Sequence, residues 1–139
     1  MNIGFTGTRN GMTVEQMIAL KELLNILEEP LIAHHGDCVG ADKNFHDIIK
    51  KFRPNTLIHI HPPSFTAERA FCKGDVLLSE EDYRTRNYNI VDSCDILIAA
   101  PYRNTEESYS GTWMTVRYAR RKQKRHVIIW PTGKMKWWN

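Results

Sequence analysis

The chain has 139 residues, of which 42% are hydrophobic and 25% charged, and its net charge is +3, values typical of one folded globular domain. No stretch approaches the roughly 20 consecutive apolar residues of a membrane span, and the first residues lack the basic-then-apolar pattern of a signal peptide. We therefore expect a single domain over residues 1–139, in the cytoplasm and without a membrane partner.

The first strand and helix are marked by an apolar run and a capping motif. Residues 2–6 predict a strand that ends at Gly7. Thr13 predicts a helix start, because Gln16 stands three residues later and completes a capping box. An apolar stripe at helical spacing continues to Leu27.

The middle of the chain repeats the alternation of strand and helix. Residues 31–35 and 57–61 predict the second and third strands, with a helix at 41–52 between them. Residues 64–82 show no clean period. We interpret them as a loop or lid with a helical piece around 67–71.

Two further strand–helix pairs complete the pattern. Helices are predicted at 82–93 and 111–121, and strands at 95–100 and 126–130. Two adjacent tryptophans at 137–138 need cover, so they are expected to pack back or to lie in a subunit contact. If they are exposed, they favour a homodimer or a higher homo-oligomer.

Five short apolar strands that alternate with helices predict an α/β fold. The expected architecture is a Rossmann-like three-layer α/β/α sandwich with a five-stranded, mainly parallel sheet. Right-handed crossovers favour the strand order 3-2-1-4-5. Its switch point lies between strands one and four, where ligands bind outside the carboxyl ends of the strands.

Glycine-bearing segments gather at that predicted edge. Glycines let backbone N–H groups approach an anion, and a helix N-terminus offers unpaired donors. Nearby hydroxyl and guanidinium groups would add hydrogen bonds to a phosphate. The candidate ligand-binding residues are Gly7, Thr8, Arg9, Gly36, Asp37, Gly40, Asp42, Arg86, Asn87, Pro101, Ser110, Gly111 and Thr112.

The histidines and cysteines do not specify a metal site. His59 and His61 share one face of a strand, whereas His34 and His35 point to opposite faces. A site would also need a third ligand and a second shell, which nothing in the sequence specifies. The three cysteines form no CxxC pair and are interpreted as reduced thiols. We therefore predict no metal and no cofactor.

Three motifs together resemble the SLOG superfamily, the Rossmann-like group that includes the LOG-type cytokinin-activating phosphoribohydrolases and the DprA and YspA-like domains. GFTGTR is similar to its first strand and loop, and HHGDCVGAD to its GGAxGAD-type segment. RNYNIVDSCDILIAAP followed by SGT looks like its arginine-bearing helix, aspartate-led strand, proline and glycine–threonine helix start. The resemblance covers about residues 2–130 and is strongest to YspA-like members.

The resemblance implies a site for a nucleotide or a nucleotide-derived signal. In LOG-type enzymes an arginine and a glutamate cleave the N-glycosidic bond of a nucleoside monophosphate. Arg86 matches the arginine, whereas Thr115 occupies the position of the glutamate. Glycoside cleavage needs a carboxylate beside its oxocarbenium-like transition state. Glu106, Glu107 or Asp37 would have to replace the missing one.

Three functions are therefore open. The favoured one is binding of a nucleotide-like small molecule, for sensing or sequestering it. The first alternative is a nucleotide N-glycosidase in which Arg86 acts with one of those carboxylates. The second is nucleic-acid binding through the basic run at 117–125, which is not favoured because acidic residues elsewhere leave no wholly basic face.

Overall fold

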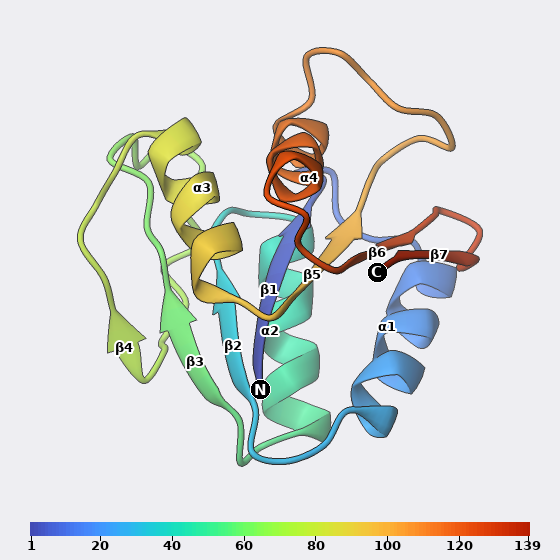
Figure 1. Cartoon of the computed structure of the whole chain (residues 1–139). Coiled ribbons are helices and arrows are strands. Elements are labelled where there is room, and N and C mark those ends of the chain that lie inside the picture. The colour runs from blue at the N-terminus through green and yellow to red at the C-terminus, as the bar shows by residue number, and fades with distance from the viewer.

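One mixed sheet runs through the middle of the molecule in the computed structural model, which describes residues 1–139 (Figure 1). The strands are β1 (Asn2–Gly7), β2 (Ile32–His35), β3 (Leu57–Ile60), β4 (Val76–Leu77), β5 (Ile96–Ala100), β6 (His126–Ile129) and β7 (Met135–Trp138). The helices are α1 (Val14–Ile26), α2 (Ala41–Phe52), α3 (Tyr83–Ser93) and α4 (Gly111–Arg121). The strand order is β4-β3-β2-β1-β5-β6-β7, and only β7 is antiparallel to its neighbour.

The helices cover the sheet in two pairs, α1 with α2 on one face and α3 with α4 on the other (Figure 1). On the first face Phe5 of β1 stacks on Phe45 of α2, with ring centroids 4.4 Å apart. Trp113 of α4 is the largest side chain of the buried cluster on the second face. This arrangement confirms the predicted three-layer α/β fold. No helix combines the length and apolar composition that crossing a bilayer requires.

The predicted strand count of five is wrong, although the predicted order is right. The predicted strands correspond to β1, β2, β3, β5 and β6 and are neighbours in the expected sequence. β4 and β7 extend the two edges of this sheet. The exposed β4 is only two residues long, too short for a recognisable apolar run. β7 follows a turn at Gly133 that folds the tail back onto β6.

The helical piece predicted at 67–71 is not present. Residues 64–82, called here the 64–82 segment, instead use their main chain to bond with the loop after β2. The amide of Ala70 donates to the carbonyl of Asp37 at 2.7 Å, and the carbonyl of Glu68 accepts from the amide of Val39 at 2.8 Å. Because these groups bond outside the segment, they are not available for an i to i−4 helical ladder.

The C-terminal tryptophans pack back onto the sheet, which is the first of the two predicted arrangements. Trp137 and Trp138 lie half-buried in β7, where they pack against the apolar clusters on opposite faces of the sheet. The ring of Trp138 stacks on His126 with centroids 4.9 Å apart. Half-buried tryptophans give no support for a homodimer, so the homodimer stays a prediction.

The predicted capping box at the start of α1 is present and connects this helix to the sheet. Thr13 accepts from the amide of Gln16 at 3.0 Å, and the Gln16 side chain accepts from the amide of Thr13 at 3.0 Å. The buried Gln16 amide also donates to the carbonyls of Pro101 and Ile129, each at 2.9 Å. These two bonds fix α1 against the ends of β5 and β6.

Replacing Gln16 should therefore be costly. Gln16→Ala leaves two buried carbonyls without donors, and we expect the free energy of unfolding to fall by about 2–3 kcal/mol. Urea denaturation measures the change, with Thr105→Ala on the exposed loop as a control that stays within about 0.5 kcal/mol. A Gln16→Ala protein as stable as this control would contradict the assignment.

Candidate functional site

A cleft of about 470 Å³ lies where β1, β2 and β5 end and where α4 begins. Its wall is completed by α3 and by the loop at 101–110. Ten of the predicted ligand-binding residues line it: Gly7, Thr8, Arg9, Gly36, Asp42, Arg86, Asn87, Ser110, Gly111 and Thr112. The structure thus brings together loops that are far apart in the sequence, as the predicted strand order requires.

Asp37 does not line this cleft, although it was predicted both as a ligand contact and as a substitute catalytic carboxylate. Its side chain is fully buried on the opposite side of the loop. It accepts from the Nε of Arg69 and from the amide of Cys72, both at 2.8 Å. Asp37 therefore holds the 64–82 segment in place instead of facing the cleft.

Gly40 and Pro101 also lie outside the cleft lining and have structural roles. Gly40 precedes α2 with a φ of +89°, and a Cβ there would lie 2.2 Å from the carbonyl oxygen of Arg9. Only glycine fits this close crossing of two loops. The carbonyl of Pro101 accepts from the Gln16 side chain on the side of α1.

Arg86 of α3 is the central cation of the cleft. Its side chain is buried, with 5% of the residue exposed, and its guanidinium bonds to neutral acceptors. It donates to the carbonyl of Gly36 and, through Nε, to the Oδ1 of Asn87 at 2.6 Å. None of the eight ion pairs in the structure includes Arg86. A buried cation without a direct anionic partner is unusual in a folded protein.

Two polar residues after β2 modify the field around Arg86. The carboxylate of Asp42 accepts from the amide of Cys38 at 3.1 Å. Burial raises the pKa of Asp42 to about 6, although the charge of Arg86 acts in the opposite direction. Burial likewise raises the pKa of Cys38, so its thiol is neutral where it accepts from Arg86 at 3.6 Å. The guanidinium is therefore only partly compensated.

The N-terminus of α4 supplies hydrogen-bond donors to the same cleft. Ser110 caps the helix, because its hydroxyl accepts from the amide of Trp113 at 3.3 Å. The amides of Gly111 and Thr112 in the first turn have no intrahelical partner. Together with the positive end of the helix dipole, they form a site suited to an anion.

Aromatic side chains form the remaining walls. The ring of Tyr83 lies between the guanidinium groups of Arg9 and Arg86, 4.8 and 5.4 Å from its centroid. Its buried hydroxyl has no hydrogen-bond partner in the protein. Tyr102 and Tyr109 from the loop after β5 line the cleft while being largely exposed. They offer flat surfaces on which a base could stack.

Of the remaining predicted catalytic carboxylates, only Glu107 lines the cleft. Glu106 points to two arginines of α4, with oxygen–nitrogen distances of 3.1 and 2.8 Å, and is not part of the lining. Thr115 is buried and donates its hydroxyl proton to the carbonyl of Gly111 at 2.8 Å. Helix α4 therefore contributes no carboxylate to the cleft.

Tyr83 and Cys38 line the cleft but were not among the predicted ligand-binding residues. Tyr83 stands three residues before Arg86 on the predicted helix, so their shared face was available as a signal. For Cys38 no comparable signal exists, because its exposure to the cleft depends on how the loop after β2 turns.

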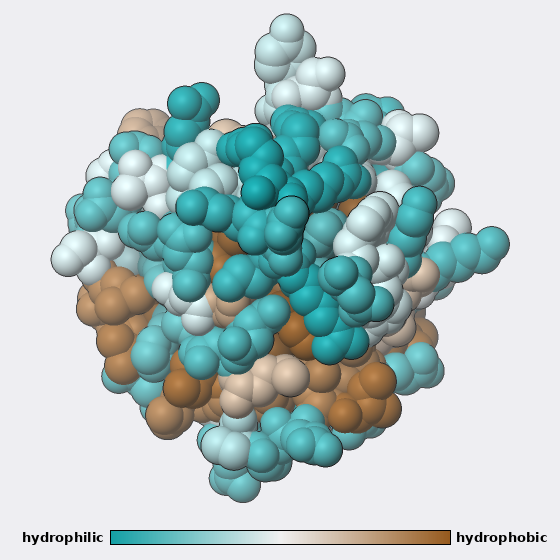
Figure 2. Space-filling view, in the orientation of Figure 1, coloured by the Kyte–Doolittle hydropathy of each residue, from teal (hydrophilic) through white to brown (hydrophobic).

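The basic run at 117–125 is only partly partnered within the chain, and it lies outside the cleft lining. Arg117 and Arg120 pair with Glu106, and Lys124 donates to the carbonyl of Cys94 at 2.6 Å. Figure 2 shows hydrophilic side chains over the face of α3 and α4, with hydrophobic ones gathered below and beside β4. Arg121, Lys122 and Arg125 form no ion pair, so the run keeps a positive charge, but this charge lies apart from the cleft.

Comparison with known proteins identifies the fold. The chain matches no protein-family model and no curated protein. The molybdenum cofactor binding protein from the phototrophic bacterium Rippkaea orientalis is similar with a TM-score of 0.70 and 22% identity, over 93% of this chain and 76% of that one. A structural-genomics target designated TM1055 gives 0.65 and 13%, over 90% and 71%. DNA processing protein A from Helicobacter pylori gives 0.59 and 15%, over 92% and 64%.

We predict that position 36 must be glycine because a side chain there would collide with Arg86, and not because a ligand needs the space. A Cβ at Gly36 would lie 2.4 Å from Nη1 of Arg86, whereas a Cβ at Gly111 meets nothing within 4 Å. We expect Gly36→Ala to displace the guanidinium and to lower the free energy of unfolding by about 1–3 kcal/mol. Gly111→Ala, the matched control, should leave it unchanged or higher. Equal urea midpoints for the two variants would refute this explanation.

Asp42 should make stability depend on pH in a predictable direction. Because its pKa in the folded protein, about 6, exceeds its ordinary 3.8, the folded state holds this proton more tightly. Stability is therefore lost as pH rises from about 4 to 6, and Asp42→Asn removes that loss. The stability of the variant minus that of the wild type should increase by about 2–3 kcal/mol between pH 4 and pH 7. A difference independent of pH would contradict the raised pKa.

Proposed function

We propose that the cleft binds a phosphorylated, nucleotide-like ligand. One support for this proposal is the SLOG-type Rossmann-like fold that the chain shares with these structures. The observation that supports this most directly is the guanidinium of Arg86, buried in the cleft without an ion pair. A bound phosphate would compensate this charge, since charge-assisted bonds between arginine and phosphate are among the strongest in proteins.

The orientation of the ligand follows from where donors and aromatic rings lie. The phosphate occupies the space between Arg86 and the unpartnered amides of Gly111 and Thr112. The base lies towards Tyr102 and Tyr109. The largely exposed Tyr109 offers a ring for stacking, whereas the guanidinium of Arg103 lies 5.4 Å from the centroid of Tyr102. This assignment uses the cation of the cleft that has no ion pair and the amides that have no acceptor.

Two of the structural neighbours support ligand binding as the function of this fold. One is named for binding the molybdenum cofactor, and another is described by its single-stranded DNA binding mode. A nucleotide-like small molecule fits the present cleft better than a nucleic acid, because the basic run lies outside the cleft lining and two of its arginines pair with Glu106.

Removing the charge of Arg86 tests the proposal. Calorimetric titration with AMP and CMP should show Arg86→Ala binding roughly tenfold or more weakly than the wild type. Arg121→Ala removes the same charge outside the cleft and is the matched control. Gly111→Val should also weaken binding, because its side chain would cover the helix amides. If Arg86→Ala and Arg121→Ala bind alike, the proposed site is wrong.

A second candidate function, cleavage of the N-glycosidic bond, is favoured by the presence of Glu107 in the same cleft. Incubation with AMP, CMP or NAD should then release free base, detected by chromatography. Glu107→Ala should abolish release while leaving binding intact, and Glu106→Ala, outside the cleft, should retain it. Nucleotide binding with no base released by the wild type would leave only the binding function.

A further inference from the structure

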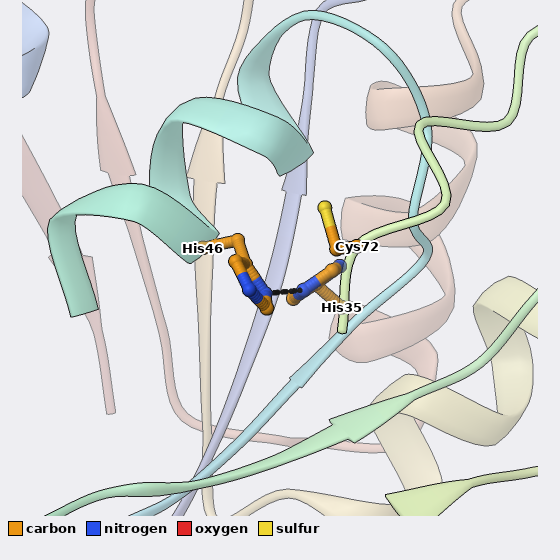
Figure 3. Close-up of side chains that lie close together, drawn as sticks. All are labelled: His35, His46 and Cys72. Atoms are coloured by element: carbon orange, nitrogen blue, oxygen red, sulfur yellow. Dashed lines mark hydrogen bonds between the residues drawn. The ribbon is translucent and has the colours of Figure 1, made fainter. Parts of the chain in front are cut away.

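A cluster of two histidines and a cysteine lies beside the cleft but is not part of its lining. His35 ends β2, His46 belongs to α2 and Cys72 to the 64–82 segment, and Figure 3 shows the three side chains close together. Their ligand-forming atoms all lie within 4.8 Å of one another. We propose that these residues bind a divalent cation of the zinc class, a site distinct from the proposed nucleotide site.

The donor set selects the class of metal. Two imidazole nitrogens and one thiolate sulfur suit zinc or cobalt, whereas magnesium and calcium prefer oxygen ligands. Burial lowers the pKa of both His35 and His46, so each ring is neutral, which is the form that binds a metal. Burial and the hydrogen bond to Asp37 raise the pKa of the Cys72 thiol to about 12, so its proton leaves only when the ion takes its place. Cys72 is half-buried, which leaves a route for an ion to enter.

The spacing is close to that of a tetrahedral site. Zinc bonds of about 2.0–2.1 Å to nitrogen and 2.3 Å to sulfur separate the ligand atoms by about 3.3–3.6 Å. His35 Nε2 and His46 Nδ1 are 3.0 Å apart, so the two rings already lie near the required separation. Cys72 has to approach by about an ångström. Its segment has neither helix nor strand at this point, so the shift does not break regular structure.

Binding of the ion changes where the protons of the cluster lie. The amide of Asp37 donates to His35 Nδ1 at 2.9 Å, so Nε2 carries the proton and donates to His46 Nδ1. When the ion binds Nε2, the proton of the His35 ring moves from Nε2 to Nδ1. The amide of Asp37 then loses its acceptor on this ring. The thiol of Cys72 loses its proton to solvent as it becomes a ligand.

The ion would add a link between three elements that already meet through the hydrogen bonds of Asp37 and the contact of His35 with His46. It would connect the end of β2, the inner face of α2 and the 64–82 segment. That segment also supplies Glu68, the ion-pair partner of Arg9 on the rim of the cleft. The ion would therefore stabilise the segment that supports the cleft, with a water completing the four ligands.

Titration of the chelator-treated full chain with Co²⁺ and Zn²⁺ tests the site. We expect one equivalent of Co²⁺ to bind with a thiolate-to-cobalt charge-transfer band, and Zn²⁺ to displace it. Cys72→Ser and His46→Gln should each lower the affinity roughly tenfold or more, and Cys72→Ser should remove the band. The matched controls, Cys94→Ser and His59→Gln, lie outside the cluster and should keep both.

Amide NMR and alkylation give independent readouts. Zn²⁺ should shift the amide resonance of Asp37 and protect Cys72 from iodoacetamide. The absence of saturable binding by the wild-type chain overturns the proposal, whatever the variants do. A charge-transfer band that persists in folded Cys72→Ser also overturns it. AMP binding by the metal-free chain leaves the nucleotide site standing in either case.

Discussion

The cleft is organised around one buried guanidinium, that of Arg86. Its position constrains three other parts of the chain: Gly36 must lack a side chain, Asn87 must present its oxygen, and the thiol of Cys38 must accept a hydrogen bond. These contacts satisfy hydrogen bonds but compensate the positive charge only in part, since no carboxylate pairs with it directly and Asp42 acts on it through the field alone. In the proposed function, the remaining charge is what a bound phosphate would neutralise.

Much of the fold could be predicted because it depends on local pattern and general rules of topology. The bounds of α2 and α4 follow from their apolar spacing, and the order of the five central strands follows from right-handed crossovers. The edge strands could not be found in this way. The pairing of Val76–Leu77 and of Met135–Trp138 depends on which edges the central sheet leaves open.

The candidate site was predictable at the level of loops and not of side chains. Strand order alone brings Gly7, Gly36 and Ser110 to one edge, and all three line the cleft. The orientation of Asp37 could not be predicted, because it depends on Arg69 from a segment without periodicity. His46 and Cys72 were missed for the same reason: their approach to His35 exists only in three dimensions.

An amide NMR titration with AMP tests the central claim most directly, since it observes the groups that would hold the phosphate. The account predicts that the resonances of Gly111 and Thr112 and of the Arg86 side chain shift together and saturate at one equivalent. In Arg86→Ala the same concentrations should produce little change at Gly111 and Thr112. Shifts confined to other parts of the molecule, or equal shifts in the wild type and Arg86→Ala, would contradict the account.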